Sequence, residues 1–302
     1  MKPASFDYHR PGTIEDAVTL LAELGDLGDG AKILAGGQSL VPMLSMRLAY
    51  FDHLIDVSRL GELQGIDRTG QELWIGAGTT DAKVGADAQV RQAVPLLTKV
   101  TPFVGHFQIR NRGTLGGSIA HADAAGEYPA VALALDAVME VLSPRGRREI
   151  AAADFFAGLW ETTMEPDEVL TGVRFPVWNG RSGFSVHEFS RRHGDFAIAG
   201  ALVAVELDDD DRVSRCGIGL LGLGSTPRRA TAAEAAVIGK PVSELVPEEI
   251  GRAAMSGLDD VRSDLQGSAS YRTRVGATMA ARAWNEAINE ARAEAVAGAS
   301  NA

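Results

Sequence analysis

Two double-glycine runs, far apart in the sequence, carry the residues best suited to hold a ligand. The first is Ala-Gly-Gly-Gln-Ser at residues 35–39, and the second is Thr-Leu-Gly-Gly-Ser at residues 114–118. Glycine has no Cβ, so its backbone can adopt positive φ and approach a ligand closely. Successive N–H groups in such loops form concave sites for anions. Two such loops in one domain could therefore clamp a diphosphate between them.

Neither run fits the G-x-G-x-x-G fingerprint that opens a βαβ unit, so the pattern indicates a dinucleotide held in another way. Each run taken alone is equally consistent with an ordinary turn. Arg110 and Arg112 precede the second run and could clamp a phosphate or lie in solvent on a turn. His121 and Asp123 lack metal-ligand spacing such as H-E-x-x-H, so we expect no metal site and a supporting role for His121.

The bulk composition limits the classes of function. A length of 302 residues suggests about two domains. The net charge of −11 argues against binding to nucleic acid or to an anionic membrane. The single cysteine, Cys216, excludes an internal disulfide and is too few for an iron–sulfur cluster, which needs about four ligands. We see no signal peptide and no apolar stretch of about 20 residues, so we expect no membrane span and a cytoplasmic location.

Hydrophobic periodicity places the two runs among alternating helices and strands. Thr13 followed by Asp16 predicts a helix start, and Pro95 interrupts a helix-rich region at 82–97. We expect strands at 32–35, 53–57, 137–142, 169–175, 183–190, 198–206 and 215–223, and a hairpin within 65–80. We expect helices at 14–24, 40–48, 130–135, 230–238, 247–255 and 270–295. The turn-rich residues 179–183 predict a domain boundary.

At these residues the chain resembles a known family. The run Ile-Leu-Ala-Gly-Gly-Gln-Ser-Leu at 33–40 is similar to the first flavin loop of the FAD-binding medium subunits of molybdenum hydroxylases. This family includes the carbon monoxide dehydrogenase medium subunit and the flavin domain of xanthine dehydrogenase. The second flavin loop resembles residues 110–123, and the resemblance continues, in order, at 127–130, 189–197, 222–227 and 271–272.

The resemblance implies an α+β fold in two domains. The first is a PCMH-type FAD-binding domain at 1–177, with subdomains at about 1–60 and 61–177. The second, at 178–290, is a smaller domain of antiparallel sheet plus helices, and residues 291–302 form a tail.

The resemblance also implies the biochemical role. FAD binds to this chain, while a large partner subunit carries molybdopterin and a small one carries two [2Fe–2S] clusters. The heterotrimer, which can be doubled, passes electrons through the flavin to an external acceptor. No catalytic residue is expected on this chain. A stand-alone FAD oxidoreductase and a non-catalytic assembly protein of the same fold are the alternatives, and the organic substrate and the acceptor stay open.

The resemblance carries over a set of expected FAD contacts. Residues 33–40 would wrap the diphosphate and ribityl chain, and residues 114–118 would supply opposing N–H groups and a hydroxyl. Glu127 would contact the adenosine portion or the ribityl hydroxyls. His187 stands where the xanthine enzyme has a lysine, and Ala124 where relatives often have proline. The full set is Lys32, Ile33, Leu34, Ala35, Gly36, Gly37, Gln38, Ser39, Leu40, Val104, Thr114, Leu115, Gly116, Gly117, Ser118, Asp123, Glu127, Leu170, His187 and Arg191.

Overall fold

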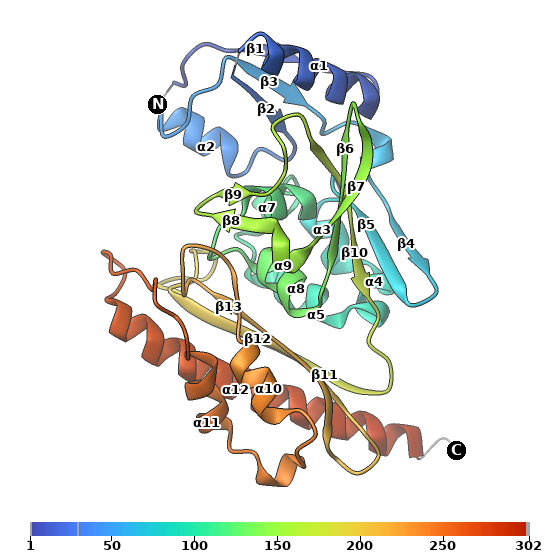
Figure 1. Cartoon of the computed structure of the whole chain (residues 1–302), viewed down its shortest axis with the longest axis vertical. Helices are drawn as coiled ribbons and strands as arrows, with labels where there is room; N and C mark the ends of the chain where they lie inside the picture. Colours follow the sequence, from blue (N-terminus) through green and yellow to red (C-terminus); the bar gives the residue numbers. More distant parts are fainter. Residues whose placement is uncertain (1, 29, 300–302) are drawn as a thin grey trace.

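Three sheets are stacked along the long axis of the molecule, as the computed structural model shows (Figure 1). The structure describes residues 2–28 and 30–299. A small parallel sheet lies at one end, a five-stranded antiparallel sheet lies in the middle, and a four-stranded antiparallel sheet lies at the other end. This combination of sheets and helices confirms the α+β fold class expected from the sequence.

The first layer has the strand order β1-β3-β2 and carries the first glycine run. The helix expected near residue 14 is confirmed, because the Thr13 hydroxyl caps it by accepting a hydrogen bond from the Asp16 N–H at 3.1 Å. The helix α1 buries Ile14, Val18 and Leu21. The elements of this layer are β1 (Asp7–His9), α1 (Ile14–Asp26), β2 (Ala31–Leu34), α2 (Leu40–Ser45) and β3 (His53–Asp56).

The middle layer has the strand order β4-β5-β10-β6-β7, so β10 lies at its centre. Its strands are β4 (Ile66–Thr69), β5 (Glu72–Gly76), β6 (Val138–Ser143), β7 (Gly146–Ala151) and β10 (Val169–Pro176). A separate hairpin consists of β8 (Phe156–Gly158) and β9 (Glu161–Thr162). The helices are η1 (Gly61–Leu63), α3 (Asp81–Ala86), α4 (Ala88–Ala93), α5 (Pro95–Val100), η2 (Thr101–Phe103), α6 (Phe107–Arg110), α7 (Leu115–His121), α8 (Glu127–Ala134) and α9 (Ala152–Phe155).

The helix-rich region expected at 82–97 is divided into three short helices. The Asp87 carboxylate accepts hydrogen bonds from the N–H groups of Gln89 and Val90, and so begins α4. Pro95 begins α5, where its missing N–H costs nothing. The same two residues therefore end one helix and start the next.

The third layer is the sheet β11-β12-β13-β14, covered on one face by a long helix. Its side chains alternate: Val203 packs with α12, whereas Leu202 joins the core of the middle layer. The strand that contains Gly183 packs directly on α12, because a Cβ on Gly183 would lie 1.8 Å from the Ala287 carbonyl oxygen. The elements are β11 (Arg181–Phe189), β12 (Ala199–Leu207), β13 (Val213–Leu221), β14 (Arg228–Arg229), α10 (Thr231–Val237), η3 (Val242–Glu244), α11 (Pro247–Ala254) and α12 (Ala269–Ala299).

The C-terminal end differs from the expected tail at 291–302. The helix α12 continues to Ala299, so residues 291–299 are helical, and residues 300–302 lie outside the described residues. Cys216 lies in the core of this layer, where burial raises the pKa of its thiol, as is typical of an unreactive core cysteine.

Candidate cofactor site

The two glycine runs meet in space. A Cβ on Gly36 would lie 2.1 Å from the Arg112 carbonyl oxygen and 2.8 Å from the Gly113 Cα. A Cβ on Gly117 would lie 3.7 Å from the Ala35 Cβ. The backbones therefore touch where only glycine fits, and the fold joins the two predicted loops into one site.

The first run leaves a series of N–H groups without acceptors. Within residues 2–28 and 30–299, none of the backbone N–H groups of residues 35–40 donates a hydrogen bond. Gly37 has φ of +72°, which turns the chain sharply after β2. The Gln38 side-chain amide donates to the Gly36 carbonyl at 3.0 Å and braces the turn. Six consecutive donors in a tight turn form a site for an anion.

The second run is the start of a helix rather than an open loop. The Thr114 hydroxyl caps α7 and accepts a hydrogen bond from the Gly117 N–H at 3.0 Å. The N–H groups of Leu115, Gly116 and Ser118 donate to the carbonyl oxygens of Thr79, Ala77 and Thr114, respectively, at 2.9–3.1 Å. We expected this run to supply opposing N–H groups, but the four N–H groups of residues 115–118 all donate to acceptors within the chain.

Buried carboxyl groups lie behind the second run. Asp81 is 2 % exposed, and a Cβ on Gly113 would lie 2.3 Å from its Oδ2. Its Oδ1 has no hydrogen-bond partner among the described residues. Burial, and then the charge of Glu127, raise the pKa of Asp81 to about 8. This acid therefore holds a proton near neutral pH.

Glu127 and Glu188 join Asp81, and we call these three residues the carboxyl cluster. Burial raises the pKa of Glu127 to about 7, and the nearby Asp123 adds to the rise. Burial, and then the charge of Glu127, raise the pKa of Glu188 to about 8, and the Glu188 Oε2 has no partner among the described residues. Arg110 does not neutralise the cluster by hydrogen bonding, because its Nη1 donates to backbone carbonyls of residues 102, 104 and 105.

Strand alternation explains why sequence reasoning missed Glu188. The His187 Nε2 lies 2.8 Å from Glu286 Oε2, so His187 is on the face of β11 that packs on α12. Its neighbour Glu188 is on the opposite face and interacts with Glu127. Asp81 was missed because an acidic residue after two threonines is typical of an ordinary helix start.

The other expected FAD contacts come from several elements of the fold. Lys32 is on β2, where burial lowers the pKa of its amine, and its Nζ lies 5.9 Å from the Phe51 ring centroid. Asp123 follows α7, and Val104 is half-buried beside α6. Leu170 is on β10, in the same core cluster as Leu115 of the second run, and Arg191 is exposed after β11.

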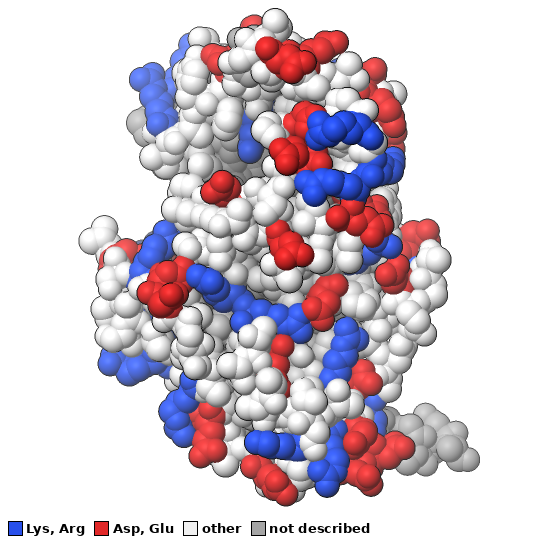
Figure 2. All heavy atoms as spheres, in the orientation of Figure 1, with Lys and Arg blue, Asp and Glu red and all other residues white. Residues whose placement is uncertain are grey.

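The surface and the metal-binding residue types complete the description. Figure 2 shows acidic and basic residues next to one another across this face, with no broad area of one sign. Among the described residues, no group of three or more His, Cys, Asp and Glu side chains is arranged to hold a metal ion. No helix in the described part of the chain is long and apolar enough to cross a membrane.

Comparison with known proteins identifies the family. Residues 4–178 match the model of the FAD-binding domain in molybdopterin dehydrogenase. The chain belongs to this family. Residues 184–287 match the C-terminal domain of the carbon monoxide dehydrogenase flavoprotein. The chain is therefore an FAD subunit of a molybdopterin-dependent dehydrogenase, as the resemblance implied.

Named relatives cover almost the whole chain. The 6-hydroxypseudooxynicotine dehydrogenase complex subunit alpha of Paenarthrobacter nicotinovorans is 42% identical, over 97% of each chain. The carbon monoxide dehydrogenase medium chain of Hydrogenophaga pseudoflava is 35% identical, over 95% of this chain and 98% of that one. The caffeine dehydrogenase subunit beta of a Pseudomonas strain is 36% identical, over 94% and 95%.

Solved structures share the fold. Carbon monoxide dehydrogenase from Hydrogenophaga pseudoflava superimposes with a TM-score of 0.91 at 37% identity, covering 96% of this chain and 99% of that chain. Quinoline 2-oxidoreductase from Pseudomonas putida gives a TM-score of 0.89 at 34% identity, covering 96% and 99%.

The residues present fit the FAD that the family implies. The diphosphate is an anion, and residues 35–40 offer it six backbone N–H groups that have no acceptor among the described residues. The close contact of Gly36 with Arg112 and Gly113 holds this turn against the second run without side chains between them. Because these donors are backbone groups, they can bind a diphosphate on a chain of net charge −11.

Proposed function

We propose that this chain is the FAD-bearing electron-transfer subunit of a heterotrimeric molybdenum hydroxylase or dehydrogenase. It would receive electrons from the [2Fe–2S] clusters of a partner and pass them to an external acceptor. The observation that carries the proposal is the series of six N–H groups at residues 35–40, which have no acceptor in residues 2–28 and 30–299 and are held against the second glycine run.

In this proposal the two runs have different tasks. Residues 35–40 bind the diphosphate through their N–H groups, and Lys32 and residues 33–34 form the approach from β2. Thr114 to Ser118 form the opposing wall, to which Ser118 adds a half-buried hydroxyl. Glu127 and Asp123 supply carboxyl oxygens for FAD hydroxyl groups, and Val104 supplies an apolar contact. Contacts from Leu170, His187 and Arg191 remain predictions from the resemblance.

Bound FAD supplies the redox chemistry, and the protein binds and orients it. The single cysteine of the chain is too few for a cluster, so we place the [2Fe–2S] clusters and the molybdopterin on a small and a large partner subunit. The names "complex subunit alpha" and "medium chain" of the relatives support a multi-subunit assembly. The cytoplasmic location also remains a prediction.

The first test is the visible spectrum of the natively purified complex, followed by acid release and identification of the chromophore. We expect FAD on this chain, and iron–sulfur absorption only when the partners co-purify. A colourless chain that does not take up added FAD would overturn the proposal. A flavin-loaded chain that never associates with partners at any salt concentration would instead support a stand-alone oxidoreductase.

A further inference from the structure

A tryptophan at the tip of the β8–β9 hairpin contacts the far end of α7. The indole Nε1 of Trp160 donates a hydrogen bond to the Asp123 Oδ2 at 3.0 Å. Its ring stacks on the His121 ring, with centroids 6.0 Å apart and planes 14° from parallel. Trp160 has φ of +57°, a backbone conformation that is uncommon and strained for a bulky residue. Such a conformation persists only where surrounding contacts hold it.

The Asp123 carboxylate is held at both oxygens. The Ala125 N–H donates to Oδ1 at 2.8 Å, while Trp160 donates to Oδ2. A carboxylate has about four acceptor positions, so each oxygen keeps the capacity to accept another hydrogen bond. Two donors therefore fix the orientation of this side chain and leave acceptors for a ligand.

The contact lies beside the candidate cofactor site. The seven residues of α7 span about 10 Å, so Asp123 is about that far from the glycines at the helix start. Burial lowers the pKa of the His121 imidazole. The charge of Asp123 raises this pKa and the charge of Lys32, on β2, lowers it further, so His121 lies within electrostatic reach of β2. Figure 1 shows β8 and β9 next to α7. Trp160 therefore fixes a carboxylate near the strand that enters the first glycine run.

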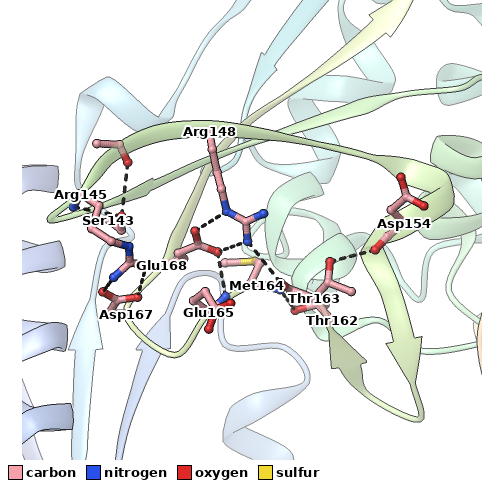
Figure 3. A network of polar contacts seen from close by, with 11 residues as sticks. Ser143, Arg145, Arg148, Asp154, Thr162, Thr163, Met164, Glu165, Asp167 and Glu168 are labelled. Atoms are coloured by element: carbon pink, nitrogen blue, oxygen red, sulfur yellow. Dashed lines mark hydrogen bonds and ion pairs between the residues drawn. The ribbon is translucent and has the colours of Figure 1, made fainter.

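The base of the hairpin is anchored to β7, as Figure 3 shows. Arg148 Nε and Nη2 donate to Glu168 Oε1 and Oε2 at 2.6 and 2.7 Å, and Nη2 also contacts the Thr163 carbonyl at 3.3 Å. The Thr163 hydroxyl donates to the Asp154 carbonyl at 2.9 Å. The tip is thus presented from an ordered base.

We propose that Trp160 is a positioning residue of the FAD site, which holds Asp123 so that its carboxylate accepts a hydrogen bond from a ribose or ribityl hydroxyl of FAD. The proposal rests on the proposed function, namely that this chain binds FAD. It adds a residue outside both glycine runs, and it assigns the indole N–H, rather than the ring surface, as the group that acts.

The test is a double-mutant cycle on the full chain after removal of its flavin. Trp160→Phe keeps a ring to stack on His121 but removes the N–H. Because Trp160→Phe leaves the Asp123 carboxylate with one donor instead of two, we expect FAD to bind roughly 5- to 20-fold more weakly, measured by flavin fluorescence. In an Asp123→Ala background, Trp160→Phe should cause no further loss. Leu159→Ala, on the same turn and 45% exposed, is the matched control and should bind FAD like the parent chain.

Three ligands distinguish the source of the hydroxyl. If the ribose is recognised, Trp160→Phe weakens binding of FAD and ADP but not of FMN. If the ribityl chain is recognised, it weakens binding of FAD and FMN but not of ADP. Either pattern supports the proposal, and weakening of none of the three overturns it.

The remaining outcomes separate this inference from the proposed function. A parent chain that binds no FAD contradicts the proposed function itself. If the parent binds FAD but Trp160→Phe leaves its affinity unchanged, or if the effects of Trp160→Phe and Asp123→Ala add fully, the positioning role is wrong. Trp160→His, which retains a ring N–H, should recover part of the FAD affinity. If Trp160 only stabilised the fold, the loss of FAD affinity in each variant would instead follow its loss of thermal stability.

Discussion

The two double-glycine runs have the same central pair of residues and opposite hydrogen bonding. At residues 35–40 the N–H groups have no acceptor within the part of the chain that the structure describes, and Gly37 adopts positive φ. At residues 115–118 every N–H is paired, and Gly116 is helical, with a Cβ that would lie 2.5 Å from the Ala77 Cα. Glycine therefore exposes donors in the first run, whereas in the second it permits close packing of backbone on backbone.

The largest effect is expected where the two runs touch. In Gly36→Ala the new Cβ would lie 2.1 Å from the Arg112 carbonyl oxygen, which is backbone and cannot rotate away. We expect the runs to separate, with loss of bound FAD and a decrease of at least about 2 kcal/mol in the free energy of unfolding. Flavin content and denaturant unfolding measure the two effects.

Gly25→Ala is the matched control for this substitution. Gly25 is in α1, and a Cβ there meets nothing within 4 Å. Alanine in a helix should stabilise the chain by up to about 1 kcal/mol and leave the FAD content unchanged. Full FAD content in Gly36→Ala would show that the runs do not need to touch.

The second prediction adds charge at a position where the only close contact, the Thr114 hydroxyl, is a side-chain atom that can shift. In Gly117→Asp the nearest contact of the Cβ is the Thr114 hydroxyl at 2.7 Å, and an acidic residue is favourable in the first turn of a helix. The fold should therefore survive, while repulsion of the diphosphate weakens FAD binding by about 100-fold or more. Gly61→Asp adds the same charge at an exposed glycine with open space around it and should have no effect. Full flavin occupancy in Gly117→Asp would refute the placement of the second run.

The third prediction concerns the buried acid behind the second run. The pKa of Asp81 is about 8 in the folded chain, well above the ordinary value of 3.8, so the protonated form is the stable one. This contribution to stability is complete at low pH and is lost as the pH rises toward 8. Each unit of pKa difference is worth about 1.4 kcal/mol, so unfolding of the flavin-free chain should become measurably easier between pH 5.5 and pH 8.5.

Asp81→Asn should reduce this pH dependence, because the amide cannot ionise, and the remainder should come from Glu127 and Glu188, whose pKa values are also raised. Asp167→Asn is the contrasting control, since the hydrogen bond from Arg145 lowers the pKa of that half-buried carboxylate. Asp167→Asn should lower stability at neutral pH, should alter the pH dependence only at acidic pH, where the parent carboxylate takes up a proton, and should leave the slope between pH 5.5 and pH 8.5 unchanged. A flavin-free parent chain whose stability does not change between pH 5.5 and pH 8.5 would contradict the assignment of Asp81 as a buried acid.

The sequence allowed the prediction of elements but not of the contacts between them. Thr13, Pro95 and the two glycine pairs act through their neighbours in the chain, so their local effects could be read in advance. The meeting of Gly36 with Arg112 depends on tertiary packing, and so does the burial of Asp81. Residues 114–118 were interpreted as a loop because glycine is a poor helix former; the Thr114 cap and the close packing on Ala77 outweigh that preference. His187 was taken from a position in the family pattern, and such a position does not reveal that the neighbouring Glu188 faces the opposite side of the strand.

The smallest effect is expected from the helix cap itself, and it tests the division of roles most directly. Thr114→Val removes the hydroxyl that accepts the Gly117 N–H, which should cost about 1 kcal/mol of stability. Thr114→Ser keeps the hydroxyl and should restore most of it. If the second run is a wall, FAD affinity should change less than about threefold in Thr114→Val, as measured by fluorescence titration alongside thermal unfolding. If its N–H groups were direct ligands, freeing the Gly117 N–H would change FAD affinity much more than it changes stability, and the contrast between the two runs would fail.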